Sequence, residues 1–289
     1  MSPLVVIVGE TASGKSALAL ELAECFDGEL ICADSWTVYK DFNIGTAKPT
    51  AAERDQVPHH LLDVAEPSEG FSAVLFQRLA QQAIADIGAR GKLPIMVGGT
   101  GLYIDSVLFD YGFLPATDPQ LRAELNALEL PILLRRAADM GLDTAGIDLR
   151  NKRRVVRLIE NNGQRPTRGE LRPRTLVLGL STEREQLHDR ITARVDAMLT
   201  AGLEAEVRQL SERYGWEVEP MKGIGYREWR EYLAGTQTYA ATRGRIIKST
   251  ADLAKRQRTW FKRNSGIHWL SDRSNAVEFI TTFLNNDLS

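Results

Sequence analysis

Apolar runs alternate with helical patterns along the first part of the chain. Three of them, Leu4–Val8, Glu29–Ala33 and Leu93–Val97, are rich in aliphatic residues with almost no polar positions between them. Continuous apolar strands are typical of a parallel sheet that is covered on both faces. A helix is predicted after the first run and another over Ser72–Arg90, with Ser72 as its cap and Gly91 as its end. This order predicts an α/β fold.

The pattern changes after about residue 115, where helical periodicity dominates and arginines crowd together. Beyond it we predict a strand at Thr175–Gly179, helices over Glu183–Leu210 and Tyr239–Arg263, and a short strand at Ile267–Leu270. The earlier stretch 40–72 is polar, contains three prolines and is predicted to be loop. We therefore expect a core formed by residues 1–114 and 173–289, interrupted by a helical insertion at 115–172.

Composition narrows the class of protein only slightly. The net charge is −2, so the chain as a whole is not a basic nucleic-acid binder, although a local basic patch is enough to bind nucleic acid. No stretch approaches the ~20 apolar residues that span a membrane, and the N-terminus lacks the basic region of a signal peptide. Cys25 and Cys32 are too few for a disulfide framework and are expected to be buried free thiols. We expect a cytoplasmic monomer.

The clearest chemistry lies in the loop after the first strand. Its residues fit the pattern G-x-x-x-x-G-K-[ST] in full: Gly9, Glu10, Thr11, Ala12, Ser13, Gly14, Lys15 and Ser16. Glycines let backbone N–H groups approach phosphate oxygens, and the following helix points its positive end at the anion. Lys15 adds a point charge, and the Ser16 hydroxyl can ligate Mg²⁺. The motif predicts a diphosphate site with ATP as the default ligand, although no Walker B strand ending in an acid follows.

An acid and a threonine follow two other predicted strands. Asp34 closes Glu29–Ala33, and Thr100 lies in the glycine-rich turn after Leu93–Val97. Ligands of open α/β sheets bind at the carboxyl ends of the strands, so both side chains are expected near Lys15. A carboxylate there can take a proton from a nucleophile. The alternative is that both positions are ordinary turns.

Taken together, the chain resembles the tRNA dimethylallyltransferases. The resemblance is carried, in family order, by Gly9–Ser16, Asp34-Ser35, Asn43–Pro49, Pro58–Asp63, Val97–Tyr103, Ile224–Glu228 and Ala254–Phe261. It implies a P-loop NTPase-like, nucleoside-kinase-like parallel sheet with an inserted helical tRNA-binding domain. It also implies transfer of a dimethylallyl group from dimethylallyl diphosphate to N6 of the adenosine beside the tRNA anticodon, with release of pyrophosphate.

The resemblance also implies roles for individual residues. Lys15 and a Mg²⁺ ion held by Ser16 would neutralise the leaving pyrophosphate, Asp34 would take the proton of the amine, and Thr100 would position the reacting groups. The residues implied to contact tRNA are Asp34, Ser35, Trp36, Thr37, Thr100, Arg122, Arg153, Arg154, Val155, Val156 and Arg157. Arginines in the insertion would hold phosphates of the anticodon stem-loop.

Three positions depart from the family, which usually has proline at Glu10 and glutamine at Thr37 and Lys222. Two other functions fit part of the pattern. An ATP-dependent small-molecule or nucleoside kinase would explain Lys15, Ser16 and Asp34, but not the basic insertion. A non-catalytic RNA-binding protein with a relic P-loop would not need these three residues intact.

Overall fold

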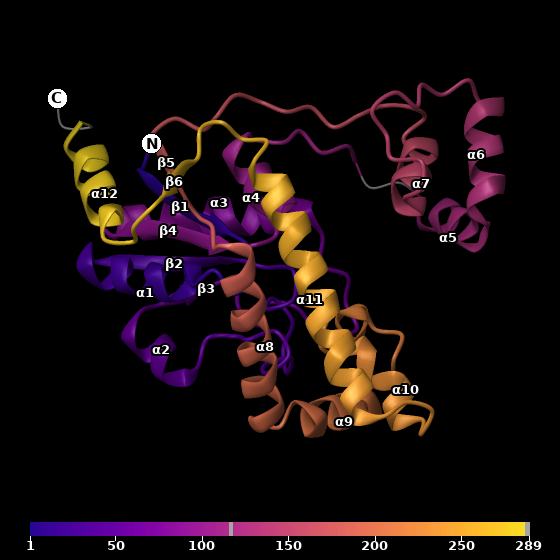
Figure 1. The fold of residues 1–289 in the computed structure, drawn as a ribbon. Coiled ribbons are helices and arrows are strands. Elements are labelled where there is room, and N and C mark those ends of the chain that lie inside the picture. Colours follow the sequence, from indigo (N-terminus) through magenta and orange to yellow (C-terminus); the bar gives the residue numbers. More distant parts are fainter. Residues whose placement is uncertain (116–117, 287–289) are drawn as a thin grey trace. The chain divides into compact units, whose positions relative to one another are not determined.

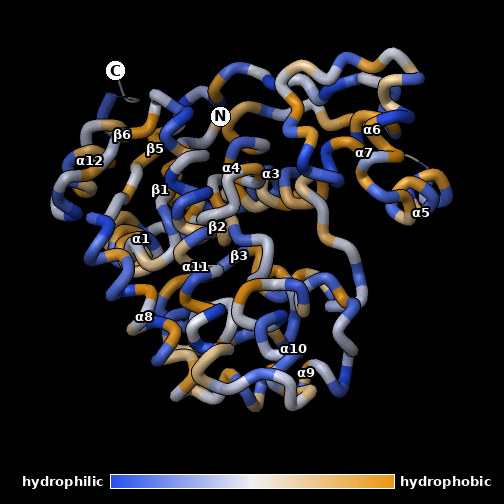
Figure 2. The backbone as a smooth tube through the Cα atoms, turned by 45° about the vertical axis from the view of Figure 1, so that its right-hand side comes forward, coloured by the Kyte–Doolittle hydropathy of each residue, from blue (hydrophilic) through white to orange (hydrophobic). Residues whose placement is uncertain are grey.

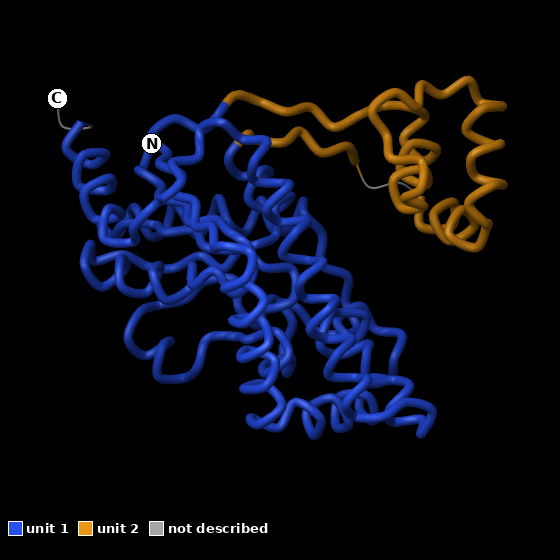
Figure 3. Tube along the Cα trace, in the orientation of Figure 1, with its two compact units in different colours: residues 1–108, 171–289 blue, residues 109–170 orange. Residues whose placement is uncertain are grey.

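A computed structural model describes residues 1–115 and 118–286 of the chain. Residues 116–117 of the expected insertion and 287–289 of the expected core lie outside the described residues. The chain divides into two compact units, one formed by Met1–Leu108 with Leu171–Ser289 and the other by Phe109–Glu170 (Figure 3). The sequence placed these borders at 114/115 and 172/173.

A parallel sheet forms the centre of the first unit (Figure 1). In the described residues it has six strands, ordered β3 (His59–His60), β2 (Gly28–Ala33), β4 (Leu93–Gly98), β1 (Leu4–Gly9), β5 (Thr175–Leu180) and β6 (His268–Leu270). From β1 the chain first crosses to β2, which lies on one side of β1 in the sheet. It later returns to form β5, which lies on the other side of β1. The loop after β1 therefore lies where the strand order switches, which is the usual ligand position in such sheets.

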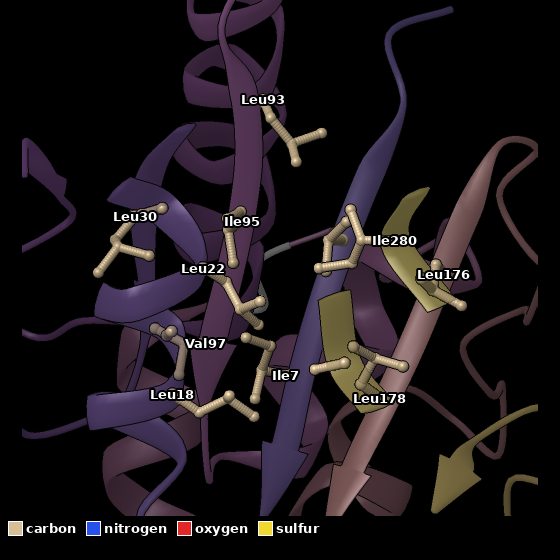
Figure 4. Close-up of a cluster of buried hydrophobic side chains, with 14 of the residues drawn as sticks. Ile7, Leu18, Leu22, Leu30, Leu93, Ile95, Val97, Leu176, Leu178 and Ile280 are labelled. Atoms are coloured by element: carbon tan, nitrogen blue, oxygen red, sulfur yellow. The ribbon is translucent and has the colours of Figure 1, made fainter. Parts of the chain in front are cut away.

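Helices cover both faces of this sheet. One face carries α1 (Lys15–Cys25) and α12 (Asn275–Asn286). Their residues Leu18, Leu22 and Ile280 pack on aliphatic strand residues such as Ile7 and Ile95 (Figure 4). The other face carries α3 (Ala73–Ala89), α4 (Gly101–Leu108) and the end of α11 (Tyr239–Phe261). Burial on both faces explains why the strands are continuously apolar.

A second apolar cluster lies below the carboxyl ends of the strands. It is formed by α11 with α8 (Arg184–Thr200), α9 (Leu203–Tyr214), η1 (Glu219–Lys222), η2 (Arg227–Trp229) and α10 (Arg230–Leu233). The fully buried Trp229 and Tyr226 belong to it, together with Tyr39 and Phe42 from the loop after β2. This cluster fixes α8 and α11 against the loops that form the site.

The second unit is a small helical bundle. Its helices are α5 (Pro119–Ala127), α6 (Leu130–Asp139) and α7 (Lys152–Glu160), and their buried residues include Leu125, Leu133 and Val155. The hydropathy pattern along α7 alternates between strongly polar and strongly apolar residues (Figure 2). An amphipathic helix of this kind buries one side and exposes the other.

The predicted α/β fold with a parallel sheet is confirmed, and so is the Ser72 cap, whose hydroxyl accepts a hydrogen bond from Leu75 N. Three predictions were incomplete or wrong. The stretch 40–72 contains α2 (Ala51–Gln56) and the edge strand β3, the helix over 183–210 is two helices, and Cys25 is exposed. Among the described residues, no helix has both the length and the apolar character to cross a membrane.

Candidate active site

The P-loop adopts the conformation that its glycines predict. Gly14 has φ 87°, in the left-handed region that favours glycine, and it leads directly into α1. Among the described residues, no side chain forms a capping hydrogen bond at the first turn of α1. The backbone N–H groups at this helix end therefore remain available to an anion, and the helix dipole favours its binding.

Lys15 begins α1, and its Nζ donates to the main-chain oxygen of Glu10 at 3.3 Å. Burial lowers the pKa of Lys15 from 10.5 to about 8, and the charge of Arg194 acts in the same direction. The carboxylates of Asp34 and Glu10 oppose this shift of the pKa. Because the Lys15 ammonium has few favourable partners, a bound polyanion would strongly stabilise its charged form.

A first cavity extends from the P-loop towards α8 and α11. Its polar lining comprises Thr11, Lys15, Ser16, Asp34, Thr37, Thr46, Glu53, His59, Arg194 and Gln257. Its apolar lining includes Leu20, Leu30, Cys32, Ala47, Pro49 and Val97. One cavity therefore offers cationic groups for a diphosphate and, beside them, an aliphatic wall.

A second cavity adjoins the first. The two share Thr11, Asp34, Thr46, Arg194 and Leu253. The second continues to Trp36, Met198, Ile224, Gly225 and Ile246, and its lining is largely apolar. A carboxylate and a guanidinium therefore lie where the two cavities meet.

Asp34 and Thr100 are held by short-range hydrogen bonds. Asp34 Oδ1 accepts from Trp36 N at 2.8 Å, and Thr100 Oγ1 accepts from Ser35 N at 3.0 Å. Asp34 lines both cavities, whereas Thr100 lines neither. Through its bond to Ser35 N, Thr100 therefore holds the turn that carries the Asp34 carboxylate.

Thr37 lines the first cavity and is buried. Among the described residues its Oγ1 has no hydrogen-bond partner. A buried hydroxyl without a partner is costly, so this group is suited to a ligand.

Arg194 was not among the residues singled out in the sequence. It lies on α8, and burial lowers its pKa while the Asp34 carboxylate opposes that effect. No local motif marks it, because α8 carries other arginines at exposed positions. Only the packing of α8 against the P-loop side of the cavities identifies it.

One wall of the first cavity is the segment 43–49, which two charged side chains hold in place. The carboxylate of Glu206 accepts from the backbone N–H groups of Asn43, Ile44 and Gly45. The buried Lys48 donates to Tyr39 O at 2.6 Å and to Asp63 Oδ1 at 2.7 Å. These bonds hold the segment in place although it belongs to no helix or strand.

Glu10, predicted among the diphosphate-binding residues, does not present its side chain to the cavities. Its carboxylate is fully buried and turned towards Arg258 of α11. The neighbouring Gln257 joins two site loops, since its Oε1 accepts from Thr11 N and its Nε2 donates to Gly99 O. α11 is therefore attached directly to the P-loop and to the turn before Thr100.

The residues of the second unit that were predicted to contact RNA differ in their exposure and in their partners. Arg153, Arg154 and Arg157 are exposed on α7. Val155 and Val156 are buried in the core of the unit, so their side chains are not exposed to solvent. Arg122 forms a two-bond ion pair with the buried Glu160.

Comparisons with known proteins identify the family of the chain. The family model described as IPP transferase matches residues 37–264. The tRNA dimethylallyltransferase of Roseiflexus sp. (strain RS-1) is 44% identical over 91% of this chain and 91% of its own length. That of Bacillus licheniformis is 39% identical over 92% and 90%.

Solved structures give the same result. The tRNA isopentenylpyrophosphate transferase of Bacillus halodurans superposes with a TM-score of 0.76 and 36% identity, covering 100% of this chain and 97% of that one. A eukaryotic dimethylallyltransferase acting on tRNA has a TM-score of 0.76 and 29% identity, covering 93% and 74%. The chain belongs to the IPP transferase family, the tRNA dimethylallyltransferases.

Proposed function

We propose that the enzyme transfers a dimethylallyl group from dimethylallyl diphosphate to N6 of the adenosine 3′ of the tRNA anticodon. The observation that carries this proposal is the position of Asp34 and Arg194 where two cavities meet, one of which reaches the P-loop. A transferase with two substrates needs such a junction, because the amine nitrogen and the allylic carbon must approach each other beside the group that takes the proton.

The donor fits the first cavity. Its diphosphate would lie on the P-loop N–H groups with Lys15 and Arg194 beside it, and its five-carbon chain would lie against the aliphatic wall. As the bond between the allylic carbon and the diphosphate oxygen breaks, its electron pair leaves with pyrophosphate. Two cations already in place stabilise that growing charge without reorganisation.

The acceptor fits the second cavity. An adenine flipped from its stack would contact apolar residues there and bring its exocyclic amine to Asp34. The amine nitrogen forms the new bond to the allylic carbon, and Asp34 accepts the proton that the nitrogen loses. Thr100 keeps the carboxylate in position through Ser35 N.

A Mg²⁺ ion is a further part of the proposal. Ser16 lies in the first turn of α1 and lines the first cavity, so its hydroxyl would be a ligand for Mg²⁺ bound with the diphosphate. Among the described residues no group of three or more His, Cys, Asp or Glu side chains could hold a metal ion. Mg²⁺, when bound with the diphosphate, supplies further charge neutralisation.

The exposed arginines of α7 would hold the phosphates of the anticodon stem-loop, and we expect a monomer to suffice for this. An ATP-dependent kinase is the alternative that the P-loop alone would allow. It has no use for the arginines of α7.

The direct test combines the protein with dimethylallyl diphosphate, Mg²⁺ and an unmodified tRNA with adenosine 3′ of its anticodon. We expect pyrophosphate release and a mass gain of one prenyl unit on that nucleoside. The same reaction with ATP in place of the prenyl donor should release no product. ATP turnover without a mass gain on the RNA would favour the kinase.

A further inference from the structure

An ion pair lies directly beside the diphosphate site. The Glu10 carboxylate accepts from Arg258 Nη2 at 2.6 Å and from Nε at 3.2 Å, so both of its oxygens are engaged. The Glu10 side chain is 0% exposed and that of Arg258 28%. A buried carboxylate is stable only with such a partner.

The pair is held by a third segment. Thr182, just after β5, donates its backbone N–H to Glu10 Oε1 at 2.9 Å and accepts from Arg258 Nη2 at 2.5 Å. The P-loop, the end of β5 and helix α11 thus meet in one closed set of hydrogen bonds. A closed set fixes the side chain of Glu10 in a single direction.

The main chain of Glu10 faces the opposite way, into the site. Its carbonyl oxygen accepts from Lys15 Nζ at 3.3 Å and from Ser13 N at 3.2 Å. The orientation of Glu10 therefore sets where Lys15 rests before an anion binds. Its negative charge also acts at Lys15, because it is one of the charges that raise the pKa of that ammonium.

We propose that Arg258 is a positioning residue for the diphosphate site. It neutralises a carboxylate that would otherwise repel the diphosphate, and through Glu10 it fixes the carbonyl that holds Lys15. Arg258 lines neither cavity and does not touch the ligand. The inference rests on the proposed use of the P-loop for a diphosphate.

The test measures binding of inorganic pyrophosphate with Mg²⁺, and separately binding of tRNA, by calorimetry. Arg258→Gln should weaken pyrophosphate binding by about tenfold or more, because one uncompensated charge a few ångströms away changes an affinity by at least that factor. Binding of tRNA should change less than about twofold. Lys262→Gln, which removes an exposed cation from the end of the same helix, is the matched control and should leave both affinities unchanged.

The double variant Glu10→Gln/Arg258→Gln separates charge compensation from simple support of the fold. With the carboxylate gone, pyrophosphate affinity should return to within about threefold of that of the unsubstituted protein. If the double variant is as weak as Arg258→Gln, or if Arg258→Gln binds normally, the inference is overturned. If the unsubstituted protein itself does not bind pyrophosphate, the proposed function of the P-loop fails first, and the inference fails with it.

Discussion

The junction of the two cavities and the arginines of α7 are built in opposite ways. At the junction, the charged groups are partly buried and are positioned by segments far apart in sequence, such as Gln257 bonded to Thr11. On α7, Arg153 and Arg154 are exposed on a short helix capped by Asn151 of the same segment. The comparison suggests that bond formation needs fixed distances, whereas holding RNA phosphates needs mainly charge.

The largest effect should come from Asp34→Asn. The amide keeps an oxygen for Trp36 N and the same shape, but it cannot take a proton from the amine. We expect the single-turnover rate to fall by about 10²–10⁴-fold. The dissociation constant for tRNA should change little, as filter binding can show. A near-normal rate would remove Asp34 from the chemical step.

Arg194→Met should follow, with a loss of about 10²–10³-fold in the single-turnover rate at saturating tRNA and donor. The reason is the loss of one of two cations beside the leaving pyrophosphate. Arg194→Lys should recover part of the rate, because it restores the charge without the planar donors. Equal rates for the Met and Lys variants would contradict a charge role.

The next prediction concerns the arginines of α7, the second region of the comparison. Arg153→Glu/Arg154→Glu should weaken tRNA binding by about 10–100-fold and flatten its salt dependence, because fewer phosphate contacts release fewer counterions. The rate at saturating tRNA should remain. Arg157 is a poorer probe, since it lies 3.7 Å from the buried Glu160.

Arg135→Glu/Arg136→Glu is the matched control for that experiment. It makes the same change of charge on exposed positions of α6 in the same unit. If both pairs weaken tRNA binding equally, the effect belongs to the net charge of the unit and not to α7.

The smallest effect concerns pH. Because burial lowers the pKa of Lys15 to about 8, this group is charged below pH 8 and loses its proton above it. Pyrophosphate prefers the charged form, so its affinity should fall as the pH rises through 8, by at most about tenfold per pH unit. Lys15→Arg stays charged and serves as the reference at each pH. Parallel profiles for the two proteins would show that Lys15 does not titrate there.

The sequence predicted the features that local patterns encode. The P-loop and Asp34 follow directly from a strand, and the strands themselves are continuous apolar runs. The edge strand β3 was missed because two residues carry no periodicity. The sequence does mark the start of helix α2, since Thr50 and Glu53 form a capping box.

Other features depend on packing between distant segments and were beyond local patterns. Arg194 lies far along the chain from Asp34, and Glu10 gave no indication that it would pair with Arg258. The burial of Val155 and Val156, in contrast, could have been predicted. With Leu158 and Ile159 they occupy spacings of three and four residues, which mark the buried side of a helix.

The second unit leaves and re-enters the core at neighbouring residues. Arg172 N donates to Leu108 O at 2.7 Å, and Gly112 and Thr167 exchange two backbone hydrogen bonds. With respect to the core, the insertion is a loop whose two ends are held together by these hydrogen bonds. The entropic cost of closing a loop grows only with the logarithm of its length. Doubling its length would cost about 0.6 kcal/mol. We expect the inserted unit to vary in size among related chains far more freely than the sheet that carries it.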